Sequence, residues 1–359
     1  MLVGVVGDSA PVVSTGTIAA YARSVLERAG SLPRNDARRA RVRLPGLSIE
    51  VHSFDAAMAE AVTRNFLPVS GTDPLSTEEM EIWIVHGEVP DSPVAARWSR
   101  GAPYAPHAVA QALDMAGLRA EYYFDLDHWH VCDPSQGTAV QLMRGPEAYP
   151  PWETGAPLRP FLHWHYARRG MRLAHAGTLG VGGKGVLMAG AGGSGKSGTV
   201  IAGLLNGLQS VGDDYVLLNA DREITAYPLY ATLKQDPVGY KRLGLDRRLP
   251  AGSLNWQGKH QFLIGQVAPR AVPSSLRIGA LLVPAVGKAS RTTIAPVPRA
   301  EAMMALAASS IHQMPGERES GFRFFSMIAQ RLPCFRLDLG REPAEIADAI
   351  GDFIGRLSR

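Results

Sequence analysis

A glycine-rich segment that ends in a lysine and a serine is the part of this sequence best suited to chemistry. Residues 190–197 read Gly-Ala-Gly-Gly-Ser-Gly-Lys-Ser and fit the pattern GxxxxGK[ST] at every fixed position. Glycines let consecutive backbone N–H groups turn inward around phosphate oxygens, in conformations that a Cβ would block. We therefore expect the phosphates of ATP to be bound by the loop and the residue after it: Gly190, Gly192, Gly193, Ser194, Gly195, Lys196, Ser197 and Gly198.

The last two residues of this loop have separate expected roles. Lys196 would reach the β and γ phosphates, and the Ser197 hydroxyl would ligate the magnesium ion that bridges them. A plain glycine turn is the alternative. The apolar run 185–189 predicts a strand before the loop, and the pattern of 197–206 predicts a helix after it. Strand, loop and helix in this order favour a phosphate site, to which the helix would add its positive N-terminal end.

Further polar residues lie at informative distances from the loop. His175 precedes Gly190 by fifteen residues, at the end of a predicted strand that would run into Gly177. Asp213 and Asp214 follow Lys196 by seventeen and eighteen residues, in a predicted strand region 210–218. Adjacent acids can divide two tasks, one binding magnesium and the other accepting a hydroxyl proton. Spacing alone leaves a solvated turn open for the acids, and an interior structural histidine is the commoner case for His175.

Together these features resemble the kinase domain of bacterial HPr kinase/phosphorylase, a P-loop fold related to phosphoenolpyruvate carboxykinase. The resemblance is clearest over residues 160–220. It implies a mixed central sheet and transfer of the γ-phosphoryl group of ATP to a serine or threonine hydroxyl. It also implies Asp213 on magnesium with Ser197, Asp214 as the base toward the acceptor, and His175 as the residue that orients that base.

A looser likeness continues to the C-terminus through Thr232-Leu-Lys234. It is to relatives encoded with peptide-modifying systems, including kinases of lasso-peptide precursors, and it implies a peptide or protein substrate. In such proteins Lys234 would face the phosphates; a surface lysine is the alternative. Gly192 stands in place of a serine of the family's loop, and Gly198 in place of a glutamate, which points away from HPr as the acceptor. Such relatives often associate, so a homo-oligomer is also expected.

Two other functions stay open from the residues: a kinase for a small molecule, and a regulatory protein that binds ATP without transfer. Phosphate clamps are expected among Arg242, Arg247, Arg248, Arg291 and Arg323. The pairs His128/His130 and His163/His165 have residue types that can ligate a metal ion, but neither has a third ligand at a suitable spacing.

Composition limits the partners and the compartment. Lys and Arg total 37 and Asp and Glu 33, so the net charge of +4 suits anionic ligands but gives no basic stripe for nucleic acid. The two cysteines, Cys132 and Cys334, have no CxxC partner. No run of 18 apolar residues occurs. We therefore expect a cytoplasmic protein that binds neither membrane nor nucleic acid.

Prolines suggest how the chain is divided. They cluster over 146–160 and predict a boundary between an N-terminal α+β domain, 1–150, and a catalytic domain, 151–359. The first domain would help to bind the substrate. Helices are expected at 15–29, 161–169 and 343–357, and strands at 81–86, 121–132, 138–143, 277–283 and 334–338.

Overall fold

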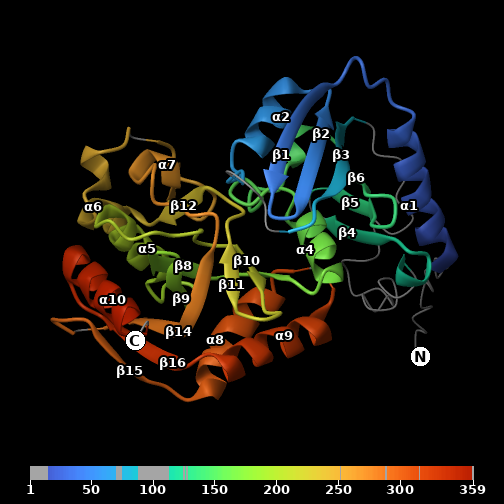
Figure 1. The fold of residues 1–359 in the computed structure, drawn as a ribbon. Coiled ribbons are helices and arrows are strands. Elements are labelled where there is room, and N and C mark those ends of the chain that lie inside the picture. The colour runs from blue at the N-terminus through green and yellow to red at the C-terminus, as the bar shows by residue number, and fades with distance from the viewer. Residues whose placement is uncertain are drawn as a thin grey trace, which may run out of the picture. The chain divides into compact units, whose positions relative to one another are not determined.

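The computed structural model describes residues 15–69, 75–87, 113–123, 126, 128–250, 252–287, 289–314 and 316–357, with side chains from residue 18 onward. The chain forms two compact units. The first comprises Met1–Ala37 and Ile82–Tyr149, and the second comprises Arg38–Glu81 and Pro150–Arg359. Figure 1 shows the elements of both, and each unit is described here by itself.

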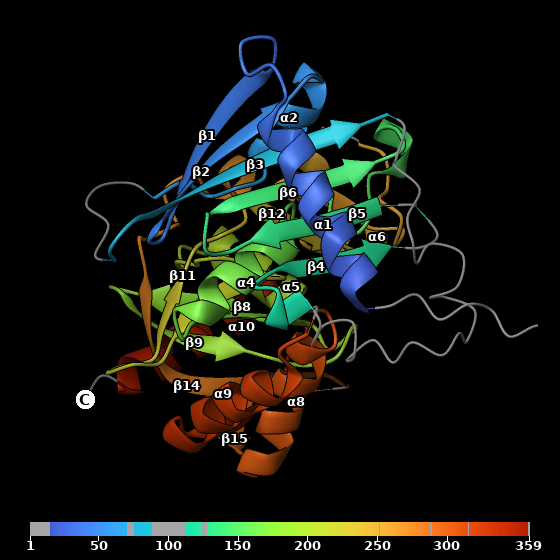
Figure 2. The ribbon, with the colours of Figure 1, turned by 90° about the vertical axis from the view of Figure 1, so that its right-hand side faces the viewer.

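In the described part of the first unit, helix α1 packs on an antiparallel sheet. Its strands follow the order β3-β6-β5-β4, where β3 (Glu78–His86) enters from the second unit and the others are β6 (Thr138–Met143), β5 (His128–Asp133) and β4 (Arg119–Tyr123). Helix α1 (Thr15–Gly30) lies across β5 and β6 (Figure 2). Trp129 is fully buried between them, with its ring centroid 5.1 Å from that of Tyr21. A short 3-10 turn, η2 (Pro146–Ala148), follows β6.

The single long strand predicted over 121–132 is wrong. The structure has two strands here, and β4 pairs with β5 so that Tyr123 lies opposite His128. The intervening sequence contains Asp125 and Asp127, and aspartate favours turns. The aromatic residues on both sides concealed the break between the two strands, because each flank is strand-like on its own.

The second unit is built on a mixed eight-stranded sheet. Its order is β15-β16-β14-β11-β10-β7, and β9 joins through β14 and carries β8. Strand β14 (Leu276–Val286) is parallel to β9 (Lys184–Met188) and β16 (Cys334–Leu339) and antiparallel to β11 (Thr225–Tyr227). The remaining strands are β7 (Arg172–Ala174), β8 (Gly177–Val181), β10 (Val216–Asn219) and β15 (Thr293–Pro296). The unit is thus a mixed α/β fold.

Alternating residues of the central strands face two separate cores. In β9, Val186 and Met188 pack with helices α5 (Lys196–Leu205) and α10 (Pro343–Leu357). Leu187 points the other way, into a core completed by α8 (Arg299–Ile311) and α9 (Arg318–Arg331). Successive strand residues point to opposite faces, so continuous apolar runs are what a strand covered on both sides requires. Figure 1 shows the two helix pairs on opposite faces of β14.

A second sheet and several short helices complete this unit. Strand β12 (Thr232–Gln235) pairs antiparallel with β13 (His260–Leu263). The chain between and after them forms α6 (Pro237–Arg242), η3 (Leu245–Arg247) and α7 (Ile264–Val267). Helix α4 (Arg159–Arg168) leads into β7.

Residues 38–81 belong to the second unit, which differs from the predicted domains 1–150 and 151–359. They form the hairpin of β1 (Arg38–Leu44) and β2 (Leu47–Ser53), then α2 (Ala56–Thr63). The Leu67 N–H donates to the Leu229 carbonyl and the Ala231 N–H to the Asn65 carbonyl, both at 2.8 Å. These bonds link segments that are far apart in the sequence. A domain boundary predicted from clustered prolines cannot take such links into account. Within the part of the chain that the structure describes, no helix is both long and apolar enough to cross a membrane.

Candidate functional site

The glycine-rich loop lies between β9 and α5, as the sequence predicts. Gly193 and Gly195 have φ angles of 81° and 98°, in the left-handed region that favours glycine. A Cβ on Gly195 would collide with Leu339, and one on Gly190 would lie 2.8 Å from the Ser194 hydroxyl. At Gly192 and Gly193 a Cβ would meet nothing within 4 Å. The loop is therefore closely packed on its sheet side and open on the other.

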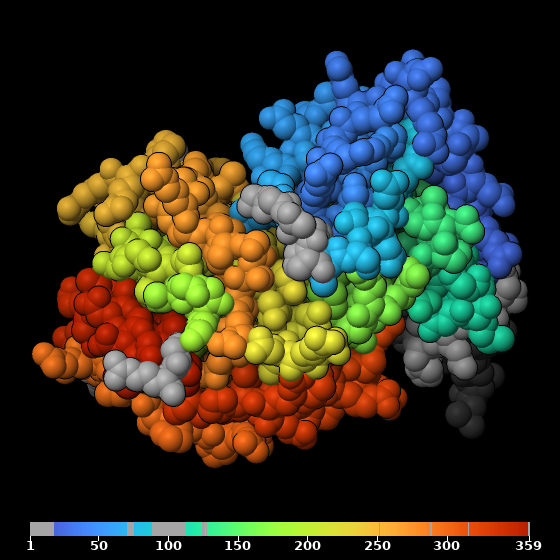
Figure 3. Space-filling model, viewed as in Figure 1, coloured from blue at the N-terminus to red at the C-terminus, as the bar shows by residue number. Residues whose placement is uncertain are grey.

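Lys196 is folded back onto this loop. Its Nζ donates to the carbonyl oxygens of Gly190, at 2.5 Å, and Ala191, at 3.3 Å. The residue is only 6% exposed, and this burial lowers the pKa of its ammonium, an effect that the carboxylates of Asp213 and Asp214 oppose. Lys196 thus places a buried positive charge beside the loop. In the space-filling view, α5 reaches the surface between α6 and α10 (Figure 3).

Strand pairing brings Asp213 to the same place. Met188, the last residue of β9, lies opposite Gly177, the first of β8. The next residue, Thr178, donates its N–H to the Gly212 carbonyl at 3.1 Å. Asp213 follows directly, and its Oδ1 would lie 3.1 Å from a Cβ on Gly177. Residues 188–190 and 213 thus meet at one end of β8.

Asp213 is a buried carboxyl group that lacks strong partners. It is 1% exposed, and neither of its oxygens has a hydrogen-bond partner of good geometry among the described residues. Burial raises its pKa, and neighbouring Asp214 adds to this, whereas the nearby Ser197 hydroxyl and Lys196 ammonium lower it. Buried carboxylate oxygens are costly unless they are well paired, so Asp213 and Ser197 are the residues beside this loop that could hold a cation.

Asp214 has the opposite surroundings. Its Oδ2 accepts from the Lys234 Nζ at 2.7 Å, and its Oδ1 lies 3.2 Å from the His175 Nε2. Burial acts to raise the pKa of Asp214, but Lys234 and His175 together outweigh burial and hold the pKa well below its usual range. The structure therefore brings His175, Asp214 and Lys234 together, and Lys234 is not an isolated surface lysine.

The Asp pair lies in a turn and does not end a strand. The predicted strand over 210–218 begins only at Val216, because Gly212 and Asp214 have φ angles of 147° and 69°. The predicted strand that would run through His175 into Gly177 is likewise interrupted, with β7 ending at Ala174 and β8 starting at Gly177. Both corrections have one cause. The apolar residues on either side predict continuous strands. The strands are instead interrupted at the polar residues His175, Asp213 and Asp214, which lie close together in the fold.

Three residues that the sequence analysis did not single out extend the site beyond His175. Gln313 Nε2 lies 3.1 Å from His175 Nδ1. The Tyr215 hydroxyl donates to Gln313 Oε1 and accepts from Arg159 Nη1, the latter at 2.5 Å. Gln313 follows α8 and is 138 residues from His175, so no local pattern could have indicated it.

Two more cations lie near the loop. Lys259 is close enough to Lys196 to lower its pKa further. A Cβ on Gly198 would lie 3.6 Å from the Arg242 guanidinium, which places this candidate clamp beside the first turn of α5. Arg323 instead forms an exposed ion pair with Glu319 on α9, at 3.5 Å. Of the predicted arginines, Arg242 thus lies beside the residue that follows the loop.

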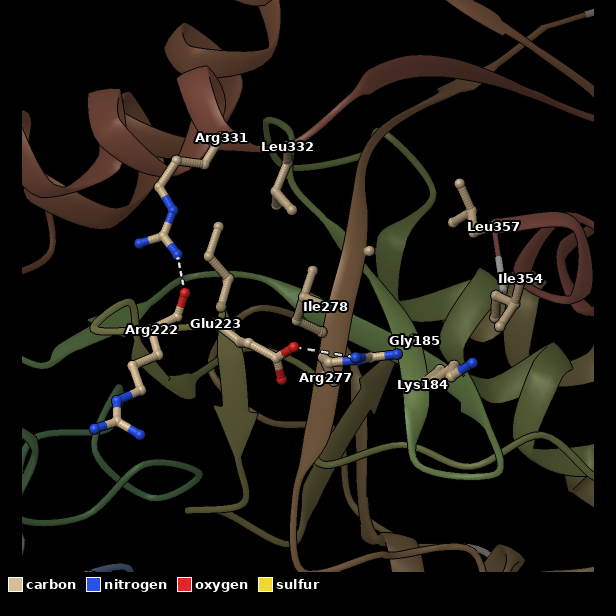
Figure 4. Close-up of a pocket in the computed structure, with 12 residues that line it drawn as sticks. Lys184, Gly185, Arg222, Glu223, Arg277, Ile278, Arg331, Leu332, Ile354 and Leu357 are labelled. Carbon is tan, nitrogen blue, oxygen red and sulfur yellow. Dashed lines mark hydrogen bonds and ion pairs between the residues drawn. The ribbon is translucent and has the colours of Figure 1, made fainter. Parts of the chain in front are cut away.

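The other candidate groups do not form sites. His163 and His165 are buried on α4, and burial lowers the pKa of each to about 4. No cluster of three or more metal-ligating side chains occurs among the described residues. A cavity of about 350 Å³ opens beside Lys184, Arg277 and Leu357, near the Arg277–Glu223 ion pair (Figure 4). Lys184 starts β9 and the glycine loop follows its end, so this cavity lies away from the loop.

Comparisons with known proteins give little more. No protein-family model matches this chain, and no curated protein matches its sequence. Among solved structures, the chain is similar to an HPr(Ser) kinase/phosphatase from Coxiella burnetii, with 11% identity and a TM-score of 0.30. That match covers 52% of this chain and 93% of the other.

Proposed function

We propose that the second unit is an ATP- and magnesium-dependent kinase that transfers the γ-phosphoryl group to a serine or threonine hydroxyl of a peptide or protein. One observation carries the proposal. Two adjacent acids beside the glycine loop have opposite environments: Asp213 is buried without strong partners, and Asp214 is held ionised by Lys234 and His175. Opposite environments on neighbouring carboxyl groups are typical of a division of labour in catalysis.

The residues at the loop fit a magnesium–nucleotide complex. Asp213 and Ser197 are hard oxygen donors, and Mg²⁺ takes one or two protein oxygens together with substrate phosphates. Such a cation would satisfy the two oxygens of Asp213, which have no hydrogen-bond partner of good geometry among the described residues. When bound, magnesium would neutralise charge on the phosphate oxygens. Lys196 and the open backbone at Gly192 and Gly193 would hold the β and γ phosphates.

The reaction follows from the position of Asp214. Its carboxylate would accept the hydrogen bond of the acceptor hydroxyl and orient that oxygen toward the γ phosphorus. The new bond joins the acceptor oxygen to phosphorus, the bond to the β-phosphate oxygen breaks, and the hydroxyl proton passes to Asp214. A carboxylate with a lowered pKa is a weak base. It suffices here, because phosphoryl transfer has a loose transition state and depends on positioning more than on early deprotonation.

The peptide acceptor rests on the family resemblance of the sequence, so the experiment must separate acceptor classes. Purified full-length protein is incubated with magnesium and γ-labelled ATP in three parallel reactions. One receives a library of Ser- and Thr-containing peptides, one receives free amino acids and sugars, and one receives no acceptor. We expect label in the peptides. Label in the small molecules would instead show a small-molecule kinase.

A matched pair of variants controls for binding without transfer. D214N is expected to retain ATP binding and lose transfer, whereas D348N, at an exposed position on α10, should behave as wild type. Full activity in D214N would overturn the role of this carboxylate. If the wild type binds ATP but transfers to no acceptor, the chain is a nucleotide-binding regulator and the kinase proposal fails.

A further inference from the structure

A chain of hydrogen bonds leads from a buried arginine to the carboxylate of Asp214. It passes from Arg159 to the Tyr215 hydroxyl, then to Gln313, His175 and Asp214. All five residues belong to the second unit. A guanidinium only donates and a carboxylate only accepts, so one consistent direction of donation runs along the chain from Arg159 to Asp214.

The arginine sets the direction. A guanidinium only donates, so the Tyr215 oxygen accepts from Arg159 and its O–H is free to donate to Gln313. The Gln313 atom that receives it must be the carbonyl oxygen Oε1, which turns the amide Nε2 toward His175. An amide nitrogen also only donates.

The histidine must therefore accept on one nitrogen. Gln313 Nε2 donates to His175 Nδ1 at 3.1 Å, so Nδ1 carries no proton. The ring proton then lies on Nε2, which faces Asp214 Oδ1 at 3.2 Å and donates to it. The reverse tautomer would place two donors against each other at Gln313 and leave Asp214 without a donor from the ring.

We infer that Gln313, held by Tyr215 and Arg159, is a positioning residue that fixes His175 as the neutral tautomer with its proton on Nε2. Its effect on transfer rests on the proposed function; the tautomer does not. The backbone N–H of His175 donates to Ser310 Oγ at 3.0 Å, so the end of α8 holds both the main chain and the ring of His175. This arrangement places the His175 ring N–H on Oδ1 of Asp214 while Lys234 contacts Oδ2, so the orientation of the carboxylate is set from both sides.

The tautomer can be measured directly in the full-length protein without any substrate. Long-range ¹H–¹⁵N correlation spectra of protein labelled in the histidine rings separate protonated from unprotonated ring nitrogens. The chain has ten histidines, and H175Q identifies the signal of interest. We expect His175 to be protonated on Nε2 only. A proton on Nδ1 in the wild type would overturn the inference.

Two substitutions test whether Gln313 sets this state. Q313E replaces the donor with an acceptor, so Nδ1 should gain a proton while the Tyr215 contact is kept. Q313L removes both contacts and should yield a mixture of tautomers. Q330E, at an exposed site on α9, serves as the matched control and should leave the His175 signal unchanged. An unchanged His175 signal in Q313E would also overturn the inference.

Kinetics then test the role in transfer. Q313L should lower kcat roughly 10-fold, as for loss of a group that orients a catalytic residue, and leave KM for ATP unchanged. If the wild type transfers phosphate and Q313L keeps its full kcat, Gln313 has no positioning role. If no acceptor is phosphorylated by the wild type, the proposed function fails, and the spectra alone decide the tautomer.

Discussion

Two parts of the second unit bury polar side chains. In one of them the side chains pair with opposite charges, and in the other they do not. At the glycine loop, acids and lysines converge, and Asp214 lies within 3.2 Å of both a lysine and a histidine nitrogen. In α4, His163 and His165 are as deeply buried, but neither ring nitrogen of His163 has a hydrogen-bond partner among the described residues. Burial alone therefore does not mark a site. The loop differs from α4 because opposite charges converge beside an open backbone.

The largest expected effect is on the rate of transfer, which should fall for a substitution at the glycine loop and not for one in α4. On the proposed mechanism, D214N should lower kcat about 1,000-fold, because the acceptor hydroxyl would lose the carboxylate that orients it and takes its proton. Nucleotide binding should be unchanged, since the amide keeps the shape of the side chain. H163F, in α4, should change kcat little. The measurement is steady-state transfer from labelled ATP; equal losses in both variants would remove the contrast between the regions.

The magnesium concentration that the protein requires should distinguish Asp213 from Asp214. D213N is expected to raise the magnesium concentration for half-maximal activity about 100-fold, because one anionic oxygen ligand is lost. D214N should leave the magnesium dependence of ATP binding unchanged. Binding of a fluorescent ATP analogue, titrated with magnesium, compares the two variants. Equal magnesium requirements in D213N and wild type would exclude Asp213 as the ligand.

Lowering the pH should reduce the free energy of unfolding, because α4 buries histidine side chains. The pKa of His163 is about 4 in the folded chain against 6.5 unfolded, so between these values the unfolded chain binds the extra proton. Stability therefore falls as pH drops from 7 to 5, by about 2 kcal/mol for this residue. Urea unfolding of H163F should lack this part of the loss. H312F, which replaces an exposed histidine, should keep it.

The smallest effect concerns the partner of Asp214. K234M should lower kcat about 10-fold, because the carboxylate loses the cation that holds its pKa low. The pKa of Asp214 then rises, so the acid limb of the pH–rate profile should move to higher pH. K184M, remote from the loop, is the control. A profile that does not move in K234M would show that Lys234 does not set the charge of Asp214.

The sequence was most informative where the chemistry is local. Residues 190–197 could be interpreted because one short segment supplies the backbone turns and the lysine. The spacing of the two acids drew attention to them but left a turn open, and their roles came from the family resemblance. Their left-handed backbone could not be predicted, since Gly212 and Asp214 make contacts with β8 and Lys234, which lie elsewhere in the sequence. Gln313 could not be found at all. Its contact with His175 exists only because α8 packs against the end of β7.

The left-handed backbone at Asp214 restricts which residues can replace it. A β-branched or bulky side chain at a φ of 69° is strained, and asparagine, aspartate and glycine are the residues that adopt this region most readily. Selection for the turn alone would therefore accept asparagine, aspartate or glycine. Selection for a negative charge as well would accept only aspartate of these three. Among homologous chains, exchange among the three at this position would mark lineages that have kept the shape and abandoned the chemistry.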